Sequence, residues 1–486
     1  MTRPIPIPFG PWEPDQATLE SGALTVAINV TPVAGGYGPA YSFNSTASVL
    51  ETPIKGASVL ANDRLEQYIY AGSDQDIYLS INGAAFSSVY SASGTSDARW
   101  QFSRFVGKAI AVHPDNVPVG GDLGAAMTPL GGSPPPAVTC GVVGNFLVLG
   151  NLDDGIDGLR ANRIRWSAFR NPNSWGTNIG TQADFNDMPD EGGAVEGIIG
   201  REFGTVFQRF MISRMTYVGP PTVFQFDVVE KKRGAIAPGT IIDCGLVAAY
   251  IADDGFFIWD GTSSTPIGAQ RVNEFFRKRL FPGSENKIVG TFDPLDQIVS
   301  WAYETDDTGI LKERLSFSLT ENRWTLSDLH AYWFMSGFDI ALTLEDLDAF
   351  GPLDNLPFSL DDPSLQGGRV RAVGFDTNGA YGTLTGDALE GRIETGDWQS
   401  GPGMRAFVNS VRPLVDAGSV TCAVGSRQQA LSDPIAYTPD SPSVLDGRCP
   451  LRASGRYLRV RTTIAGSQTW SRCTGVEVHA AQEGAR

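Results

Sequence analysis

Histidine is scarce in this 486-residue sequence, which has only His113, His330 and His479. The three lie far apart, none has a companion at metal-ligand spacing, and none can be argued to act as a general base. His330, within Leu329–Trp333, is expected in the core or at an interface. The sequence also has no G-x-S-x-G elbow, no P-loop and no H-E-x-x-H motif. We therefore expect no catalytic, cofactor-binding or metal-binding residues, and no enzyme.

Cysteine is also sparse, with five residues and no C-x-x-C pair. This odd count gives neither zinc-ligand spacing nor a disulfide framework, and buried free thiols fit a chain that folds in a reducing cytoplasm. Three of the five fall near the end of the chain, which leaves one late disulfide bridge open. The cysteines are Cys140, Cys244, Cys422, Cys449 and Cys473.

Long apolar runs and an excess of basic charge are missing as well. No apolar run approaches the roughly 18 residues of a membrane span, and the opening MTRPIPIPFGPWEPDQ lacks the apolar region of a signal peptide. The 37 Lys and Arg are outnumbered by 54 Asp and Glu, for a net charge of −17. Wrapping nucleic acid needs a basic footprint, so this balance favours a surface that repels DNA, with plain solubility as the alternative reading.

Turn-forming and aromatic residues are abundant, with 56 Gly, 31 Pro and 10% aromatics. From about residue 60 to 395, short strands end in tight turns with an aromatic residue at or beyond the turn. Such hairpins are typical of an all-β chain. The strand and turn pairs are Ile77–Ile81 with Asn82-Gly83, Ile164–Ala168 with Asn171-Pro172, Phe256–Trp259 with Asp260-Gly261, Leu315–Leu319 with Glu321-Asn322, and Val373–Phe375 with Asn378-Gly379.

The spacing of these strands favours a β-propeller. They lie near positions 77, 164, 257, 317 and 375. A four-stranded blade needs roughly 40 to 50 residues, so we expect each wide gap to hold two units, or one unit plus insertions. The sequence predicts about six or seven irregular blades, whose radial closure would protect the strand edges. A pair of β-sandwiches is the competing all-β arrangement.

Three regions are expected. Residues 1–60 are expected to form an extended arm that packs partly on the propeller or on a neighbour. Its prolines at positions 4, 6, 8, 11 and 14 alternate, which forbids a helix and a regular strand ladder there. Residues 61–395 form the propeller, interrupted by a long loop at 113–137 and a short basic helix at 270–280 whose apolar stripe indicates packing. Residues 396–486 read as a small, separate C-terminal β-sandwich.

Two charged features suggest specific hypotheses. Acidic residues cluster at Asp153, Asp154 and Asp157, and again at Asp184, Asp187, Asp190 and Glu191. Such clusters could bind calcium, or could hydrolyse glycosides as carboxylate pairs, although surface turns are the simpler reading. In the C-terminal region, Arg456, Arg459 and Arg461 alternate with apolar residues. This stripe could meet an acidic partner or form a solvated strand face.

Several stretches resemble the tail hub or nozzle proteins of short-tailed bacteriophages. They are Pro14–Leu24, Ala27–Pro32 with Gly35-Gly36-Tyr37, Asn162–Ser167 with Asn171-Pro172 and Trp175, and Gly234–Gly261. The resemblance spans roughly residues 14–330 and rests on pattern, because that family has no catalytic signature. It implies a structural virion protein built around a β-propeller, made in the host cytoplasm and located in the virion tail.

The resemblance also implies partners and a mechanism. Such proteins assemble as a ring, typically a hexamer, below the portal and its adaptor ring, and carry fibres or a spike. They continue the DNA channel, so genomic DNA would pass the lumen without specific binding, and they serve DNA retention and ejection. The alternative function is a carbohydrate-binding or receptor-binding propeller, similar to a tailspike. A cellular interaction propeller would need a regular 40- to 45-residue period, which the sequence lacks.

Overall fold

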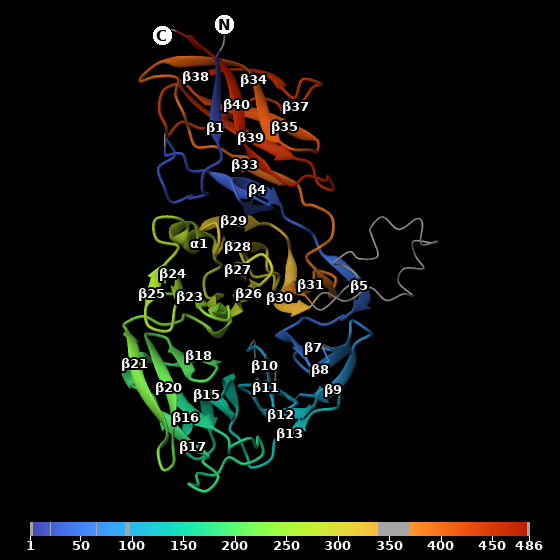
Figure 1. Ribbon diagram of the computed structural model, residues 1–486, viewed down its shortest axis with the longest axis vertical. Coiled ribbons are helices and arrows are strands. Elements are labelled where there is room, and N and C mark those ends of the chain that lie inside the picture. The colour runs from blue at the N-terminus through green and yellow to red at the C-terminus, as the bar shows by residue number, and fades with distance from the viewer. Residues whose placement is uncertain (1–2, 20, 65, 93–97, 339–368, 484–486) are drawn as a thin grey trace.

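The computed structural model describes residues 3–19, 21–64, 66–92, 98–338 and 369–483, and groups of strands in the lower part of Figure 1 surround one axis. Within this part of the chain, six separate sheets have four strands each, and the four strands β26–β29 form the start of a larger sheet. The first strand of each group contacts the first strands of neighbouring groups or faces the axis. The fold is therefore an all-β propeller of seven blades, which confirms the fold class predicted from the sequence.

Blades 1 to 4 follow one another along the chain. Blade 1 holds β6 (Ala57–Ala61), β7 (Gln67–Gly72), β8 (Asp76–Ile81) and β9 (Ser87–Ser91); blade 2 holds β10 (Gln101–Phe105), β11 (Lys108–His113), β12 (Asn116–Asp122) and β13 (Thr128–Pro129). Blade 3 holds β14 (Ala137–Val143), β15 (Phe146–Asp154), β16 (Gly158–Trp166) and β17 (Asp184–Asp187); blade 4 holds β18 (Val195–Gly200), β19 (Gly204–Gln208), β20 (Met211–Gly219) and β21 (Val223–Lys231).

Blades 5 to 7 complete the ring. Blade 5 holds β22 (Ile242–Asp243), β23 (Ala248–Ala252), β24 (Gly255–Trp259) and β25 (Ser264–Pro266); blade 6 holds β26 (Val289–Asp293), β27 (Ile298–Tyr303), β28 (Glu313–Ser318) and β29 (Arg323–Ser327). Blade 7 holds β30 (Ala331–Phe338), β31 (Val370–Asp376), β32 (Ala380–Thr383) and, from the start of the chain, β5 (Asn44–Val49). The helices are η1 (Asp190–Gly192), η2 (Pro238–Thr240), α1 (Asn273–Arg279) and η3 (Glu285–Lys287).

The five strands predicted near positions 77, 164, 257, 317 and 375 fall where the blade pattern requires them. Four of them are the third strands of blades 1, 3, 5 and 6, and the fifth is β31 of blade 7. Blades 2 and 4 fill the two wide gaps, as expected. The turn after β8 has Asn82 at φ 50° and Gly83 at φ 78°, the left-handed backbone for which Asn-Gly is selected.

The long loop predicted at 113–137 is wrong in part, because β12 and β13 lie within it. The glycines that suggested a loop serve packing instead. A Cβ on Gly121 would lie 2.5 Å from the backbone carbonyl oxygen of Ala126. Only a residue without a side chain lets the backbone approach so closely. The three prolines 134–136 do remain outside the strands.

The ring is closed by a strand from the other end of the sequence. β5 pairs antiparallel with β32, placing Asn44 opposite Thr383 and Val49 opposite Ala380. Blade 7 thus combines residues 331–383 with residues 44–49. This pairing holds the first and last blades together without any partner chain.

A β-sandwich lies beyond blade 6 and contains both ends of the chain (Figure 1). One sheet comprises β3 (Val30–Val33), β4 (Gly36–Pro39), β40 (Cys473–Glu483), β34 (Arg405–Val415) and β38 (Cys449–Gly455), with β1 (Arg3–Pro8) also on β40. The other comprises β2 (Val26–Ile28), β33 (Gly391–Glu394), β39 (Tyr457–Ile464) and β35 (Val420–Arg427), which pairs with β36 (Ala436–Tyr437) and β37 (Ser441–Pro442). Segment 1–60 therefore contributes strands to both the sandwich and blade 7.

The proline-rich start of the chain forms a ladder that the sequence analysis excluded. β1 pairs with β40 over six consecutive positions, from Arg3 opposite Ala480 to Pro8 opposite Gly475. Prolines 4, 6 and 8 alternate, and successive N–H groups in a strand point to opposite edges. All three missing donors therefore fall on one edge, and β1 pairs through the other. The alternation is compatible with an edge strand and protects that edge from further pairing.

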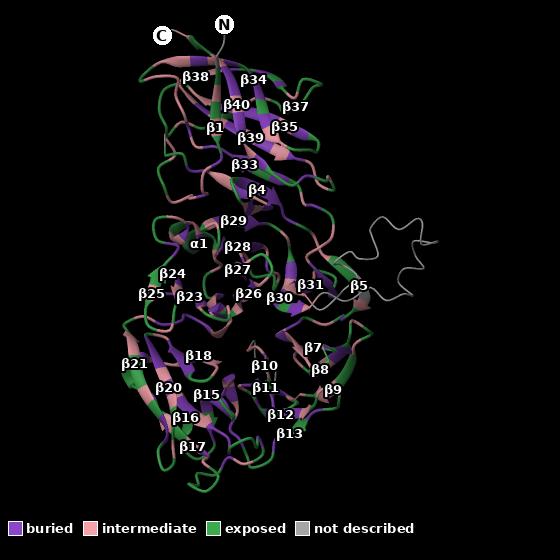
Figure 2. Cartoon of the chain, in the orientation of Figure 1, coloured by how far each residue is buried: buried purple, intermediate pink, exposed green. Residues whose placement is uncertain are grey.

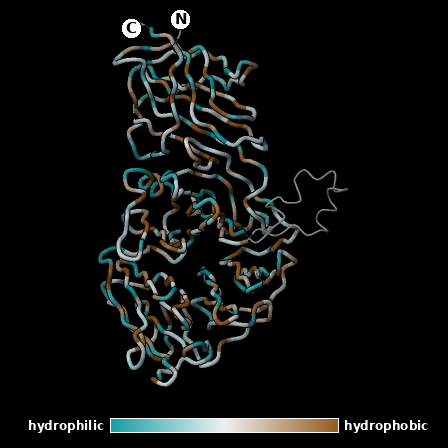
Figure 3. The backbone as a smooth tube through the Cα atoms, viewed as in Figure 1, coloured by the Kyte–Doolittle hydropathy of each residue, from teal (hydrophilic) through white to brown (hydrophobic). Residues whose placement is uncertain are grey.

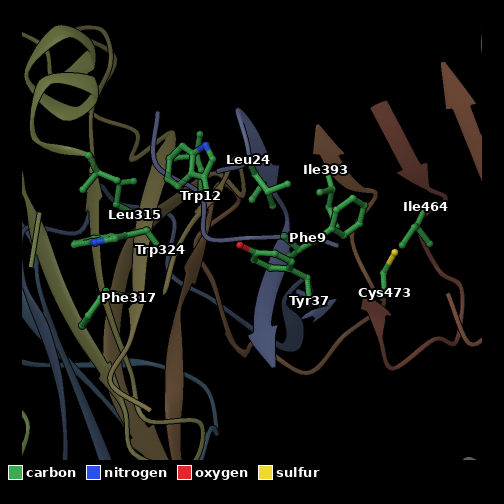
Figure 4. Close-up of a cluster of buried hydrophobic side chains, with 14 of the residues drawn as sticks. Phe9, Trp12, Leu24, Tyr37, Leu315, Phe317, Trp324, Ile393, Ile464 and Cys473 are labelled. Carbon is green, nitrogen blue, oxygen red and sulfur yellow. The ribbon is translucent and has the colours of Figure 1, made fainter. Parts of the chain in front are cut away.

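The sandwich and the propeller share one sheet. β2 pairs parallel with β29 of blade 6 through Ile28 and Leu326, and antiparallel with β33 of the sandwich. A single hydrophobic cluster crosses the junction, and Figure 4 shows Trp324 of blade 6, Trp12 and Tyr37 of the N-terminal segment, and Ile464 of the sandwich within it.

Hydrophobic residues alternate with hydrophilic ones along many strands (Figure 3), and exposed residues gather on outer strands such as β9 and β21 (Figure 2).

The predicted basic helix is α1, and its apolar stripe packs as expected. Val272 and Phe276 are buried, and Trp12 lies edge-on to Phe275 with ring centroids 5.2 Å apart. The carboxylate of Asp15 accepts the backbone N–H groups of Glu274 and Phe275, each at 2.8 Å. The N-terminal segment thus supplies the helix with its cap from outside the local sequence.

Candidate functional site

The two acidic clusters come together around one arginine. β16 and β17 pair side by side, and Arg163 of β16 reaches Asp157 at 2.6 Å, Asp187 at 2.6 Å and Asp154 at 3.2 Å. The hydrogen bonds from Arg163 lower the pKa of Asp187. With a guanidinium already between them, these carboxylates offer neither a cation cage nor a free acid–base pair. In the described chain no group of three or more His, Cys, Asp or Glu side chains could hold a metal ion.

The histidines and cysteines considered from the sequence do not gather at one site. His113 is buried beside Trp100, with ring centroids 4.9 Å apart, and burial lowers its pKa. His330 is exposed, so it does not lie in the core, and the interface position that the sequence also allows stays a prediction. His479 is buried in β40. All five cysteines are free thiols. Cys422, Cys449 and Cys473 therefore form no disulfide bridge with one another, although the sequence had left one late bridge open.

The basic residues of the sandwich are largely paired within the chain. Arg459 and Arg427 both reach Asp397, at 3.0 and 2.8 Å, and Arg461 reaches Glu394 at 2.6 Å. Asp397 and Glu394 are buried, and Arg456 is partly exposed. The stripe is therefore mostly an internal ion-pair network rather than a solvated face.

An axial cavity of about 870 Å³ lies where the seven blades meet. Its wall includes the inner strands β6, β10, β14, β18, β26 and β30, with η2 and Ile241 at blade 5. Most lining residues belong to the beginnings of inner strands or to the links that precede them, so the cavity lies toward that face of the propeller. Its volume lies in the range of small-molecule sites.

Arg99 is a half-buried cation in this wall. Its guanidinium donates from Nη1 to the carbonyl of Ile288 at 2.9 Å and from Nη2 to the carbonyl of Lys287, and its Cζ lies 4.8 Å from the ring centroid of Trp333. Burial lowers the pKa of Arg99 to about 9, so the group stays charged at neutral pH. No carboxylate of the described residues lies within 4.0 Å of it, because the neighbouring Glu304 pairs with Lys287 at 3.3 Å.

Glu196, at a register shift in β18, lines the same cavity. Within the described part of the chain its carboxylate has no hydrogen bond or ion pair, and burial raises its pKa to about 7. Asn151 lines the cavity from a second register shift, in β15, with a left-handed φ of 57°. Register shifts and left-handed non-glycine residues are enriched at functional sites, because they re-aim a side chain at the cost of local strain.

A second feature is an exposed apolar patch on blades 3 and 4, which we call the rim patch: Phe169, Ile179, Tyr217 and Val218. Their exposed fractions are 46, 67, 44 and 50%. Phe169 and Tyr217 both contact buried Phe146, with ring centroids 5.6 and 5.7 Å away. Grouped exposed apolar side chains of this kind mark interaction surfaces. The sequence analysis did not identify this patch, because its members come from two blades.

Comparisons with known proteins assign neither a family nor a function to this chain. No family model matches the chain, and no curated protein matches its sequence. The WD40 domain of Neurospora crassa Pan2 is 6% identical and matches 57% of this chain and 79% of that one, with a TM-score of 0.37. BamB from Moraxella catarrhalis is 10% identical and matches 61% of this chain and 94% of that one, with a TM-score of 0.31.

A streptogramin B lyase is 10% identical and matches 60% of this chain and 91% of that one, with a TM-score of 0.36. At such identities a likeness concerns the fold alone, which the strand pairing of this chain already defines. No helix in the described ranges is long and apolar enough to cross a membrane.

Proposed function

We propose that the protein is a structural subunit of a ring in a short bacteriophage tail, and that it is not an enzyme. The ring, a hexamer in the family that the sequence resembles, would continue the DNA channel below the portal and adaptor, support fibres and serve DNA retention and ejection. The rim patch is the observation that carries the proposal. It offers an exposed apolar surface on blades 3 and 4, which lie at the opposite end of the molecule from the sandwich (Figure 1).

The architecture supports this proposal in two further ways. Head-to-tail rings need two different surfaces on each subunit, and an elongated molecule with a sandwich at one end and the rim patch at the other has them. The shared sheet β26–β29–β2–β33 joins the two parts, so they can transmit load as one body. A net charge of −17 per copy would add to the same field in a ring and repel transiting DNA.

The test is the mass and projected symmetry of the purified protein, by light scattering and electron microscopy of the same sample. We expect a ring, formed alone or on addition of portal–adaptor complex. Val218→Asp should prevent ring formation while leaving the circular dichroism spectrum unchanged, because it places a charge in the rim patch. Val117→Asp is the matched control, since Val117 is similarly exposed, at 44%, but lies on blade 2.

A carbohydrate-binding or receptor-binding propeller is the second candidate, favoured by the polar side chains of Arg99, Asn151 and Glu196 in the wall of the axial cavity. A stable monomer that ignores the portal–adaptor complex but binds bacterial surface polysaccharide would contradict the ring proposal and support this one. A Val218→Asp protein that still forms rings would show that the rim patch is not the contact.

A further inference from the structure

The axial cavity collects polar side chains that the chain itself leaves unused. The carboxylate of Glu196 and the amides of Asn151 and Asn286 form no hydrogen bond or ion pair within the described residues, and all three line the cavity. Gln101 uses its Oε1 to accept from Thr139 and from the backbone of Cys140, and its NH₂ group donates to no other described residue. Asn286 is exposed and Gln101, Asn151 and Glu196 are half-buried, so their polar atoms can be reached from the cavity by a ligand that bonds to them.

Arg99 defines the charge of that ligand. Two backbone carbonyls and the face of Trp333 fix the guanidinium in place, and it forms no ion pair with a carboxylate of the described residues, although Glu304 is near enough to attract it. A planar, immobilised guanidinium is the preferred partner of a carboxylate. Lys287, the other cation of the cavity wall, is occupied by Glu304 at 3.3 Å and Asp307 at 3.5 Å. One available cation suits a single carboxylate better than a phosphate dianion.

The other polar groups define the rest of the ligand. Amides both donate and accept hydrogen bonds, as hydroxyl groups do, so Asn151, Asn286 and Gln101 match a polyhydroxylated molecule. An apolar ligand fits poorly, because the rings of Trp100 and Trp333 are buried and their N–H groups donate to Ser73 and Ala57. The cavity of about 870 Å³ can hold one or two sugar rings.

We propose that the axial cavity binds a sugar acid, with its carboxylate on Arg99 and its hydroxyl groups on Asn151, Asn286 and Glu196. The two strand-register shifts at Asn151 and Glu196 place both side chains on this wall. The site lies within one closed propeller, so it does not require ring assembly and is compatible with either function considered above.

Isothermal titration calorimetry with D-glucuronate, D-galacturonate, D-glucose and acetate tests the proposal. At least one of the two sugar acids should bind at least tenfold more tightly than glucose and than acetate, because only a sugar acid engages both Arg99 and the amides. Arg99→Gln and Asn286→Ala should each weaken that binding at least tenfold. Asn286 is exposed in η3 and its side chain forms no hydrogen bond with the described residues, so its variant remains informative if Arg99→Gln fails to fold.

Arg104→Gln is the matched control, because Arg104 lies on β10 of the same propeller but pairs outside the cavity with Asp63. It should leave binding unchanged. If neither sugar acid binds more tightly than glucose and acetate, or if Asn286→Ala binds as the unaltered protein does, the proposal is overturned. Repeating the titration with the Val218→Asp protein separates this outcome from any failure of ring assembly.

Discussion

At the scale of single residues, the charged groups inside this protein are of two kinds. Arg163 between three aspartates and Arg459 beside Asp397 are neutralised by ion pairs, whereas Arg99 and Glu196 in the axial cavity form no ion pair with the described residues. The two arrangements have opposite consequences for stability. A paired buried charge costs stability when its partner is removed, and an unpaired one costs stability whenever it is ionised.

Glu196 should make the protein less stable as pH rises. Its pKa is about 7 in the folded protein against 4.5 for the unperturbed group, so between these values the folded state binds more protons. The stability associated with protonated Glu196 is present below about pH 4.5 and is lost as pH rises through 7. Glu196→Gln should therefore raise the free energy of unfolding by about 1–2 kcal/mol at pH 8, allowing for solvent screening, with little change at pH 5.

Urea denaturation at both pH values measures this difference. Glu202→Gln is the control, because Glu202 is exposed in the next turn of the same blade. An equal effect of Glu196→Gln at pH 5 and pH 8 would mean that ionisation of Glu196 is not responsible.

Removing Arg163 should be costly at neutral pH and less so in acid. Arg163→Gln leaves Asp154, Asp157 and Asp187 facing one another, and we expect a loss of about 3 kcal/mol at pH 7. Arg163 holds the pKa of Asp187 below its usual value, so the stabilisation is present above about pH 4 and is lost as pH falls through that lowered pKa. Thermal unfolding at pH 7 and pH 3 checks this, with exposed Arg170→Gln as the control; a deficit that is unchanged at pH 3 would contradict it.

At the scale of elements, strands and helices are completed by segments far away in sequence. β5 supplies the outer strand of blade 7, β1 covers β40, and Asp15 caps α1. Each of these contacts ties residues 3–49 to an element that would otherwise have an open edge or end.

Replacing Asp15 by Ala should loosen α1 without unfolding the propeller. Two backbone N–H groups lose their acceptor, which costs about 1 kcal/mol. Hydrogen exchange should show lower protection of the amides of Glu274 and Phe275, with the strands of blades 1 to 4 unchanged. Asp15→Asn should retain most of the protection, since asparagine also caps helices; equal losses in both variants would indicate a charge effect instead.

At the scale of the whole molecule, the propeller and the sandwich are joined by the hydrophobic cluster at their junction, by β2 and by the hydrogen bonds of Asn29. Asn29, with φ 56°, donates to Asp328 at 2.7 Å and to the carbonyl of Glu390 at 3.2 Å, and its Oδ1 accepts from Ser327 and from the backbone of Asp328. Asn29 thus bonds to the end of blade 6 and to the entrance of the sandwich together.

Asn29→Ala should separate the unfolding of the two parts. It removes these hydrogen bonds from a buried site and places a less tolerant residue at a left-handed φ, for an expected loss of about 2–4 kcal/mol. Differential scanning calorimetry should give one transition for the unaltered protein and two for the variant. Asn409→Ala, at an exposed asparagine of β34, should keep a single transition; two transitions in the unaltered protein would contradict the coupling.

The sequence by itself determined the local features of this protein. Hairpins such as β8–Asn82-Gly83–β9 were predictable because the turn preference resides in the residues of the turn, and the spacing of these hairpins sufficed for the all-β propeller class. The alternation of Pro4, Pro6 and Pro8 also indicates an edge strand, once the direction of the missing donors is considered.

Only the tertiary structure decided which distant segments meet. The insertion of β2 between β29 and β33, the closure of blade 7 by β5, and the grouping of Arg99, Asn151 and Glu196 around one axis each join residues from separate parts of the chain. Such pairings follow from the burial of the whole core and the closure of the ring, which no short sequence pattern encodes. The rim patch and the axial cavity were therefore not predictable from the residues that form them.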